Sequence, residues 1–357
     1  WTSSPFEPMI RDNQVYARGA VDNKGQCFYT LTCLKALKEL SIPLDYNVKL
    51  IIEGEEESGS GALSLFLKKK KRELKADHLL IVDMGIPSAH TPAVTLGLRG
   101  ITTLEVECRN SSVDLHSGIH GGVVLNPNQA LVVVLSKLWD KKGKIAIPGF
   151  YKNVTIPSKK ELSSIDCSFS KRELAENFGI RAFQKPLRSS LWENNALFPT
   201  LEINGISGGY TGLGFKTVIP SLAIAKISCR LVPDQDPDKV AHSIGNFLKK
   251  QVPKGIEISY KIDHGGRSVR VSAHSKIAQI AASAFEAVFD KPCQRILCGA
   301  SVPIVAELQR ASCSDVAMIG VALSEDDFHA PNEHFGWDRF YKGFLVMGHI
   351  LSSVKNS

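Results

Sequence analysis

The sequence predicts an α/β fold: a mostly parallel sheet flanked by helices, interrupted by an inserted segment of α+β character. Three observations lead to this fold class. In the first part of the chain, short apolar runs alternate with polar turns and helical patterns, an order typical of a sheet covered by helices. Near residue 98 the pattern changes to strands that alternate polar and apolar side chains. After residue 266 a helix-rich α/β pattern resumes.

The elements of the first part follow from their apolar patterns. A strand ends near Ala17, and a glycine-containing turn spans residues 18–25. The runs 48–52 and 79–82 are continuous apolar segments of the kind found in buried strands, and a helix begins between them at about Gly61. The helix after the turn has four leucines on one stripe: Leu31, Leu34, Leu37 and Leu40.

The middle of the chain has a separate character and is predicted to be an insertion. We assign residues 1–97 and 267–357 to one discontinuous domain and residues 98–266 to the inserted domain. The elements expected from residue 98 onward are, in order, strand 101–108, helix 127–139, an irregular stretch 143–170, strand 222–232, helix 237–250, strand 256–262, helix 277–289 and strand 316–321.

Composition restricts the function classes. A chain of 357 residues is long enough for two cored domains, and no apolar stretch approaches the roughly 20 residues that cross a membrane. The net charge of +7 could indicate an acidic partner. However, the one dense basic run, 68–72, ends a helical pattern and has no interleaved aromatic residues, so we expect no nucleic-acid partner. The eight cysteines include no Cys-x-x-Cys pair, which indicates free thiols in a reducing compartment and hence a cytoplasmic protein.

Acidic residues stand where the predicted strands end. Asp22 follows the first strand, the cluster Glu55-Glu56-Glu57 follows the second, and Asp83 follows the third. In open parallel sheets, ligands gather outside the carboxyl ends of the strands. Crowded carboxylates repel one another unless a divalent cation neutralises them, and carboxylate oxygens with imidazole suit zinc or manganese. His329, in a late polar loop, could complete such a set of ligands.

Each of these residues also has an alternative interpretation. Asp22 could cap the helix that follows it, and the three glutamates could form a capping cluster at the next helix. His329 could be an ordinary surface histidine. The combination of these residues, in this order and at strand ends, favours the metal site over the separate alternatives.

Four motifs resemble those of the M20 metallopeptidases. The resemblance is closest to the cytosolic non-specific dipeptidase and carnosinase branch, and it extends over nearly the whole chain with the motifs in family order. The four motifs are Arg18-Gly19-Ala20-Val21-Asp22-Asn23-Lys24-Gly25, Glu56-Glu57-Ser58-Gly59-Ser60, Asp114-Leu115-His116-Ser117-Gly118 and His329-Ala330-Pro331-Asn332-Glu333. Three shorter segments add to them: Gly97-Leu98-Arg99-Gly100, Lys216-Thr217-Val218-Ile219-Pro220 and Arg230-Leu231-Val232-Pro233.

The resemblance implies a zinc-exopeptidase-like catalytic domain that binds two divalent metal ions, Zn²⁺ or Mn²⁺. Asp22 would bridge the two ions, Glu57 and His329 would hold one of them, and Asp83 would hold the other. Glu56 would be the general base that takes a proton from the attacking water and passes it to the leaving amine. Two such ions together lower the pKa of water and polarise the scissile carbonyl.

The inserted segment would then be the family's lid and dimerisation domain, so the resemblance implies a homodimer. His116 would reach into the partner subunit's site and help to stabilise the oxyanion. Arg230 would bind the substrate carboxylate, for which a planar bidentate donor is well suited. Thr217, His264 and Ser301 would contact the substrate. From the residues alone, Arg230 could also be an exposed partner of a glutamate, and Thr217 an ordinary turn residue.

The chain departs from the family pattern at its start. The family's first metal ligand is a histidine in a His-x-Asp pair that precedes the position of Trp1, and the aspartate of that pair orients the general base. Because the sequence starts with Trp1 rather than Met, we expect this pair upstream in the natural protein. The alternative is a truncated, inactive form. Smaller departures are Asn23, where the branch usually has Asp, and Ala300, where a second Gly is common.

The sequence thus predicts a metallo-exopeptidase that hydrolyses dipeptides or short peptides with a free carboxylate. One alternative is deacylation of N-acyl amino acids by the same chemistry. A second is a non-catalytic homologue with a degenerate site. The Glu-Glu-Ser-Gly-Ser motif and the long lid favour the peptidase. The side-chain preference of the substrate pocket and the physiological metal are not predicted.

Overall fold

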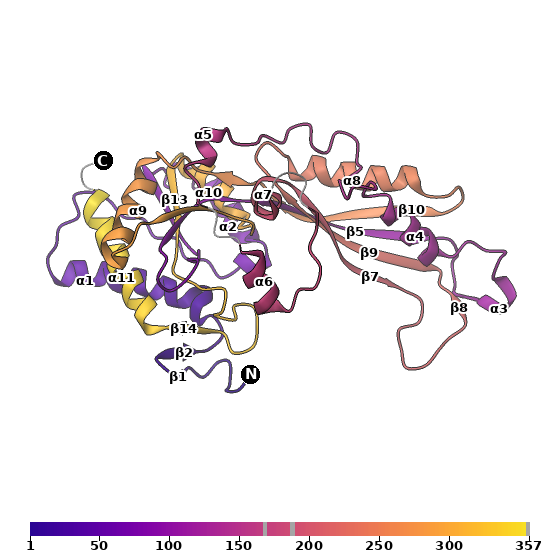
Figure 1. Ribbon diagram of the computed structural model, residues 1–357, viewed down its shortest axis with the longest axis horizontal. Coiled ribbons are helices and arrows are strands. Elements are labelled where there is room, and N and C mark those ends of the chain that lie inside the picture. The colour runs from indigo at the N-terminus through magenta and orange to yellow at the C-terminus, as the bar shows by residue number, and fades with distance from the viewer. Residues whose placement is uncertain (167–169, 186–189, 355–357) are drawn as a thin grey trace.

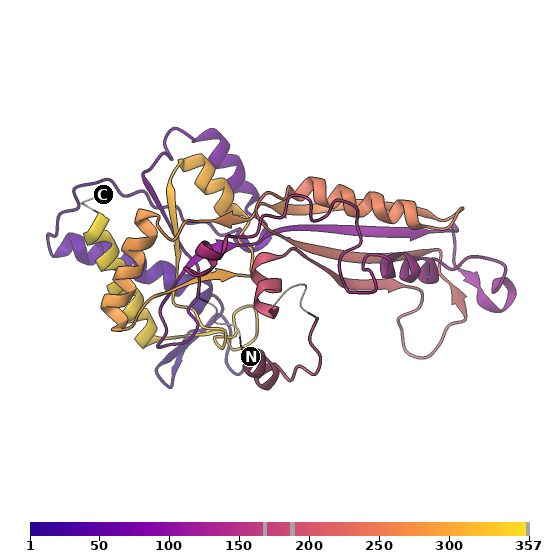
Figure 2. The same ribbon diagram turned by 45° about the horizontal axis from the view of Figure 1, so that its top comes forward.

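The chain forms an elongated molecule with two different ends (Figure 1). The structure is a computed structural model that describes residues 1–166, 170–185 and 190–354. One end is a compact part in which helices surround a sheet, and the other end is an arm of long strands. The turned view in Figure 2 shows the same arm with a helix lying along it.

The compact part is built on a five-stranded mixed sheet. The strand order is β11-β4-β13-β3, and β12 also pairs with β4. Strands β3 and β13 are parallel, as are β4 and β12, whereas β4 is antiparallel to β11 and β13. The bounds are β3 (His78–Val82), β4 (Ala93–Leu98), β11 (Val269–Arg270), β12 (Gln294–Cys298) and β13 (Asp315–Ile319).

Helices surround this sheet, so the predicted α/β fold class is confirmed. The apolar side chains of α1, α9 and α11 form the main core with the sheet, and those of α2 and α10 form smaller clusters beside it. Helix α1 packs against α11, and α11 packs against α9. The close contact of α1 with α11 requires Gly343, because a Cβ atom there would lie 2.6 Å from a ring carbon of Tyr29. The bounds are α1 (Gln26–Glu39), α2 (Gly61–Lys69), α9 (Lys276–Phe289), α10 (Ile304–Ser312) and α11 (Trp337–Ser353).

The predicted leucine stripe of α1 is wrong. Leu37 is buried, but Leu31 and Leu40 are exposed, and the buried face is formed by Tyr29, Cys33 and Leu37. These three residues are four positions apart, so they also form a continuous stripe on a helix. The apolar pattern allowed two neighbouring faces, and the position of α11 selects one of them.

The predicted buried strand at 48–52 is also wrong. Among the described residues this run pairs with no strand, and Val48, Leu50, Ile51 and Ile52 are each at least 40% exposed. Lys49 Nζ in this run donates a hydrogen bond to the carbonyl oxygen of Lys75, just before β3. A continuous apolar run indicates that a segment can be buried in a sheet, but it does not supply the neighbouring strands that bury it.

A small sheet joins the two ends of the chain. It has the order β1-β2-β14, formed by β1 (Met9–Arg11), β2 (Gln14–Tyr16) and β14 (His334–Gly336). In this sheet Tyr16 pairs with His334, and their rings stack at 4.8 Å. The pairing places the turn after β2 beside the loop before β14. These two segments contain Asp22 and His329.

The arm is a four-stranded antiparallel sheet of order β10-β5-β9-β7. In β5 buried and half-buried residues alternate, which confirms the predicted pattern of 101–108. Helices α4 and α8 pack on the sheet, and their buried side chains form a second core. The bounds are β5 (Gly100–Arg109), α4 (Pro127–Ser136), β7 (Thr200–Gly208), β9 (Leu222–Leu231), α8 (Pro237–Gln251) and β10 (Glu257–Gly266).

Short elements complete the chain. Strands β6 and β8 pair at the far tip of the arm, next to α3 (Figure 1). Within the described residues, none of the helices combines the length and the apolarity needed to cross a bilayer. The bounds are β6 (Leu115–His116), α3 (Ser117–His120), α5 (Lys159–Leu162), α6 (Lys171–Phe178), α7 (Leu191–Leu197), β8 (Val218–Ile219) and the single turns η1 (Ala20–Gly25) and η2 (Glu56–Ser58).

The strand positions support the proposed domain division into 1–97 with 267–357 and 98–266. The chain leaves the mixed sheet at the end of β4, Leu98, and enters the arm at Gly100. It leaves the arm at Gly266 and re-enters the mixed sheet at Val269. The predicted irregular stretch 143–170 contains the short helix α5, and its residues 167–169 lie outside the described ranges.

Candidate active site

Asp22 lies on the turn η1 between β2 and α1, with its side chain half-buried. Neither η1 nor α1 has a side-chain cap at its N-terminus, so Asp22 is not the helix cap that we considered. The backbone N–H groups of Gly19, Val21 and Asp22 all donate to the carboxylate of Glu333. The Asp22 carboxylate is therefore free to point away from its own turn.

Glu56 and Glu57 lie on η2, a single turn just before α2. Their neighbour Glu55 takes the capping role, because its Oε2 accepts a hydrogen bond from the N–H of Ala62 in the first turn of α2 at 3.2 Å. This leaves the carboxylates of Glu56 and Glu57 available for other partners. Of the two interpretations of the glutamate cluster, capping thus describes Glu55 alone.

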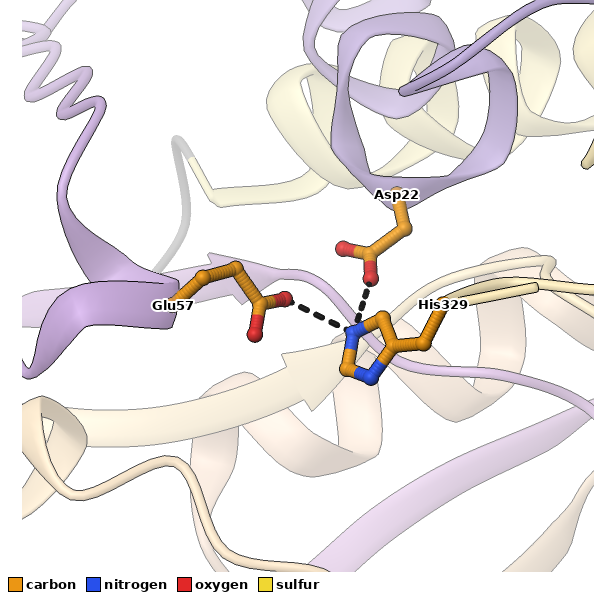
Figure 3. Close-up of side chains that lie close together, drawn as sticks. All are labelled: Asp22, Glu57 and His329. Carbon is orange, nitrogen blue, oxygen red and sulfur yellow. Dashed lines mark hydrogen bonds and ion pairs between the residues drawn. The ribbon is translucent and has the colours of Figure 1, made fainter. Parts of the chain in front are cut away.

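His329 joins Asp22 and Glu57 in one cluster, in which ligand atoms of the three side chains lie within 4.8 Å of one another (Figure 3). Its Nε2 lies 2.9 Å from Oδ2 of Asp22 and 2.8 Å from Oε1 of Glu57. Figure 3 shows the two carboxylates approaching the same ring nitrogen from different segments. Two oxygens and one imidazole nitrogen are a donor set that suits zinc or manganese, so these residues fit the metal that the sequence predicts.

The charges in this cluster shift its pKa values. Partial burial and the nearby carboxylate of Glu57 raise the pKa of Asp22. Burial alone would lower the pKa of His329, but the hydrogen bond to Glu57 and the charges of Glu57 and Asp22 outweigh it, so the pKa of His329 is raised. In this arrangement the imidazole proton offsets the carboxylate repulsion, which a divalent cation could offset instead.

Asp83 and Glu56 lie near this cluster, and the carboxylates of Asp22 and Glu57 act on both of them electrostatically. Asp83 directly follows β3, and burial together with the charges of Asp22, Glu56 and Glu57 raises the pKa of Asp83 to about 8. Burial and the charge of Glu57 likewise raise the pKa of Glu56. Carboxylate pKa values raised by burial and by neighbouring carboxylates are typical of functional sites. The ligand atoms of Asp83 are not part of the three-residue cluster.

Arg230 and Ser301 lie where the compact part meets the arm. Arg230 is near the end of β9, and its burial lowers the pKa of its guanidinium. The hydroxyl of Ser301 donates to the carbonyl oxygen of Gly100, the first residue of β5, at 3.1 Å. Both residues therefore face the junction between the two sheets.

His116 and Thr217 lie at the far tip of the arm, and within one chain the fold does not bring them to Asp22 (Figure 1). His116 ends β6 and its Nδ1 accepts from the N–H of Gly118 at 3.0 Å, while the carbonyl of Thr217 accepts from the N–H of Ser117. His264 is exposed on β10, where its Nδ1 lies 3.0 Å from the hydroxyl of Thr103.

The chain matches the model of the Peptidase family M20/M25/M40 over residues 1–353. It belongs to this family. The resemblance to the M20 metallopeptidases is therefore confirmed, and with it the prediction that the chain is a metallopeptidase-type hydrolase. Family membership also accounts for the order of the four motifs along the chain.

Relatives of this M20 chain include proteins named as dipeptidases and as a carboxypeptidase. It is 29% identical over 99% of its length to the Cys-Gly metallodipeptidase dug1 of Schizosaccharomyces pombe, and the match covers 76% of that protein. It is 30% identical over 96% of its length to the Beta-Ala-His dipeptidase of Homo sapiens, covering 69% of it. Its fold matches an M20 family metallo-carboxypeptidase from Sulfolobus solfataricus with a TM-score of 0.92 and 30% identity, over 100% of this chain and 81% of that one.

Two residues of this M20 chain that organise the site were not singled out from the sequence. Glu333 holds the turn of Asp22, as described above. Arg99 is buried at the junction, where its Nε donates to the carbonyl of Gly299 at 2.7 Å and its N–H donates to the carbonyl of Ala300 at 3.0 Å. Both residues stand inside motifs that the sequence revealed. A motif does not tell which of its members face a ligand and which hold the backbone.

Proposed function

We propose that the protein is a metal-dependent exopeptidase that hydrolyses the peptide bond of dipeptides, or of short peptides with a free carboxylate. The observation that carries this proposal is the convergence of Asp22, Glu57 and His329 on one point, with Glu56 next to them. Three turns and loops, distant in sequence, supply these residues. Carboxylates with raised pKa values that gather at one point are typical of functional sites.

Asp22, Glu57 and His329 would hold one divalent ion, and Asp22 with Asp83 would hold a second. We propose Zn²⁺ for both, with Mn²⁺ as the other candidate for the same donor set. When bound, the ions would lower the pKa of water and polarise the scissile carbonyl. The proposed assignment of Asp83 is supported by its place at the end of β3 and by its pKa of about 8, which reflects the neighbouring carboxylates as well as burial.

Glu56 is the proposed general base. Its carboxylate takes a proton from the attacking water and then gives that proton to the nitrogen of the leaving amine. A carboxylate with a raised pKa is better matched to both transfers than an ordinary one, because it accepts the proton more readily near neutral pH. Its neighbour Glu57 points at His329, so the two adjacent glutamates divide the roles of base and ligand.

Arg230 is the proposed partner of the substrate's free carboxylate. Its guanidinium is partly buried, and in the part of the chain that the structure describes it forms no ion pair with a carboxylate. A buried, unpaired guanidinium is costly and gains most from a bidentate anion. Ser301, at the same junction, would contact the substrate beside it.

His116 is proposed to act on the site of a partner subunit. Its place at the tip of the arm, far from Asp22 of the same chain, supports a homodimer formed through the inserted domain. Thr217, at the same tip, and His264, at the base of the arm where Gly265 pairs with Thr102, are proposed substrate contacts. Val132 and Val133 on α4 are 55% and 51% exposed, which is consistent with a surface that another copy covers. His116 would then help to stabilise the oxyanion of the partner's substrate.

A dipeptide panel tests the proposed function. Hydrolysis by the full natural protein is measured with added Zn²⁺ or Mn²⁺, with a chelator, and in the variant Glu56→Gln. Cleavage that needs metal and disappears in Glu56→Gln supports the peptidase and its base together. Bound metal with no turnover of any dipeptide, and turnover of acetyl-amino acids instead, would favour the deacylase. The absence of both turnover and bound metal would favour the non-catalytic homologue with a degenerate site. We propose a cytoplasmic location.

A further inference from the structure

Glu333 has a buried carboxylate that is occupied entirely by one turn of the chain. The residue is 0% exposed. Its Oε2 accepts from Nη1 of Arg18 at 2.9 Å and from the N–H of Gly19 at 2.8 Å. Its Oε1 accepts from the N–H groups of Val21 at 3.1 Å and of Asp22 at 3.0 Å. Four donors from five consecutive residues therefore converge on one side chain from the other end of the chain.

This arrangement decides where the Asp22 side chain can point. An aspartate in a turn tends to accept hydrogen bonds from the backbone N–H groups nearest to it. Here Glu333 already occupies the N–H groups of Gly19, Val21 and Asp22. These three local donors are therefore not paired with the Asp22 carboxylate, whose Oδ2 meets Nε2 of His329 at 2.9 Å.

The same carboxylate fixes the loop that carries His329. Residues Asp326 and Glu333 mark the two ends of this loop, and both are fully buried. Asp326 binds Nη1 and Nη2 of Arg339 on α11, each at 2.5 Å. Between the two ends, Arg18 Nη2 donates to the carbonyl of Ala330 at 2.9 Å. The loop is therefore tied to the core at one end and to the Asp22 turn at the other.

We propose that Glu333 is a positioning residue of the metal site: it sets the relation of Asp22 to His329 by holding both of their segments. This inference rests on the proposed metal site. A carboxylate is needed because it offers only acceptors, and all four of its partners are donors. An amide of the same shape would turn an NH₂ group toward at least one of these donors, leaving buried groups unpaired.

The test is metal affinity in Glu333→Gln. The metal-free chain and the variant are titrated with Mn²⁺, followed by electron paramagnetic resonance, and with Zn²⁺ in competition with a chromophoric chelator. We expect the variant to bind roughly 10–100-fold more weakly, the usual effect of removing a group that orients a metal ligand. Excess metal should restore part of its dipeptidase activity, because no reacting group has been removed.

A matched control separates positioning from general loss of stability. Gln235 is a buried polar residue of the arm that accepts from the N–H of Val232 and donates to the carbonyl of Phe150. Gln235→Leu should lower the Tm without changing metal affinity. Glu333→Asp keeps the charge but is one methylene shorter, so it should hold part of the turn and fall between the parent and Glu333→Gln in affinity. It also serves as the test variant if Glu333→Gln does not fold.

The outcomes are distinct. Parent-like affinity in a folded Glu333→Gln or Glu333→Asp overturns the positioning role and leaves the proposed function intact. An equal loss of affinity in Gln235→Leu overturns it as well, because the effect would then follow stability alone. These titrations use the full natural protein; if it binds neither metal, the proposed function fails, and this inference fails with it.

Discussion

At the scale of single residues, the site depends on how adjacent glutamates divide their tasks. Glu55 caps α2, Glu56 stands free as the proposed base, and Glu57 meets His329. The three side chains are chemically identical, so only their direction gives them different roles. This division can be tested by making the same substitution at neighbouring positions.

Glu56→Gln should lower kcat by about 10²–10⁴-fold while leaving metal affinity nearly unchanged, because the amide cannot accept the proton of water. The measurement is kcat for one dipeptide at saturating metal, with the metal content determined on the same sample. Glu55→Gln is the matched control. It should lose only part of the cap of α2 and keep kcat within a few-fold of the parent. A similar drop in both variants would contradict the assigned base.

Arg230→Lys should raise KM more than it lowers kcat, because an ammonium group cannot form the bidentate contact with a carboxylate. We expect about a 10-fold increase in KM, corresponding to the loss of one charge-assisted hydrogen bond. The control is a change of substrate rather than of protein. A dipeptide whose carboxylate is replaced by an amide should be a poor substrate for the parent and suffer little further loss in Arg230→Lys. An equal KM increase for both substrates would exclude the carboxylate contact.

At the scale of elements, the sequence predicted most of the fold because each helix and strand contains its own signal. The alternation of 101–108 identified β5, and the acidic residues of two polar turns identified Asp22 and Glu57, although no strand precedes the second turn among the described residues. The run 48–52 could not be assigned correctly from its composition, because its burial depends on neighbouring strands. Glu333 was missed for a related reason: its partners lie more than 300 residues away along the chain.

The N-terminal cap of helix α8 in the arm is a local sequence signal whose contribution to stability can be tested. Asp236 is its N-cap: its Oδ1 accepts from the N–H of Lys239 at 3.2 Å, and its Oδ2 binds Arg267. The hydrogen bond from Lys239 and the charge of Arg267 lower the pKa of Asp236. Because the folded pKa lies below the unfolded value, this stabilisation is present above the unfolded pKa. It is lost as the pH falls through the folded pKa.

Asp236→Ala should therefore lower the free energy of unfolding of the arm by about 1 kcal/mol at pH 7, and by less in acid, where the parent also loses its charge. Asp236→Asn should lose less than Asp236→Ala, because an asparagine still caps the helix and an exposed ion pair contributes little. Urea unfolding at pH 7 and at pH 3 measures both differences. A loss in Asp236→Ala that does not shrink at pH 3 would show that the carboxylate charge is not involved.

At the scale of the whole molecule, the elongated shape separates residues that the proposed reaction needs together. His116 lies at the tip of the arm, and Asp22, Glu57 and His329 lie in the compact part (Figure 1). A single chain cannot close this distance by rearranging side chains. In the proposed homodimer, the arm of one copy would supply His116 to the compact part of the other.

Mixing two inactive variants tests this exchange directly. His116→Ala lacks the residue that the arm would donate, and Glu56→Gln lacks the base, so each variant alone should have little activity. In a mixed dimer, the subunit with an intact Glu56 receives an intact His116 from its partner, which restores one of two sites. Random reassortment of equal amounts should recover about a quarter of the parent activity, since roughly half of the dimers are mixed. Recovery should fail if either sample is chemically cross-linked before mixing. No recovery after complete exchange, verified by mass spectrometry of the intact dimers, would mean that His116 acts within its own chain or not at all.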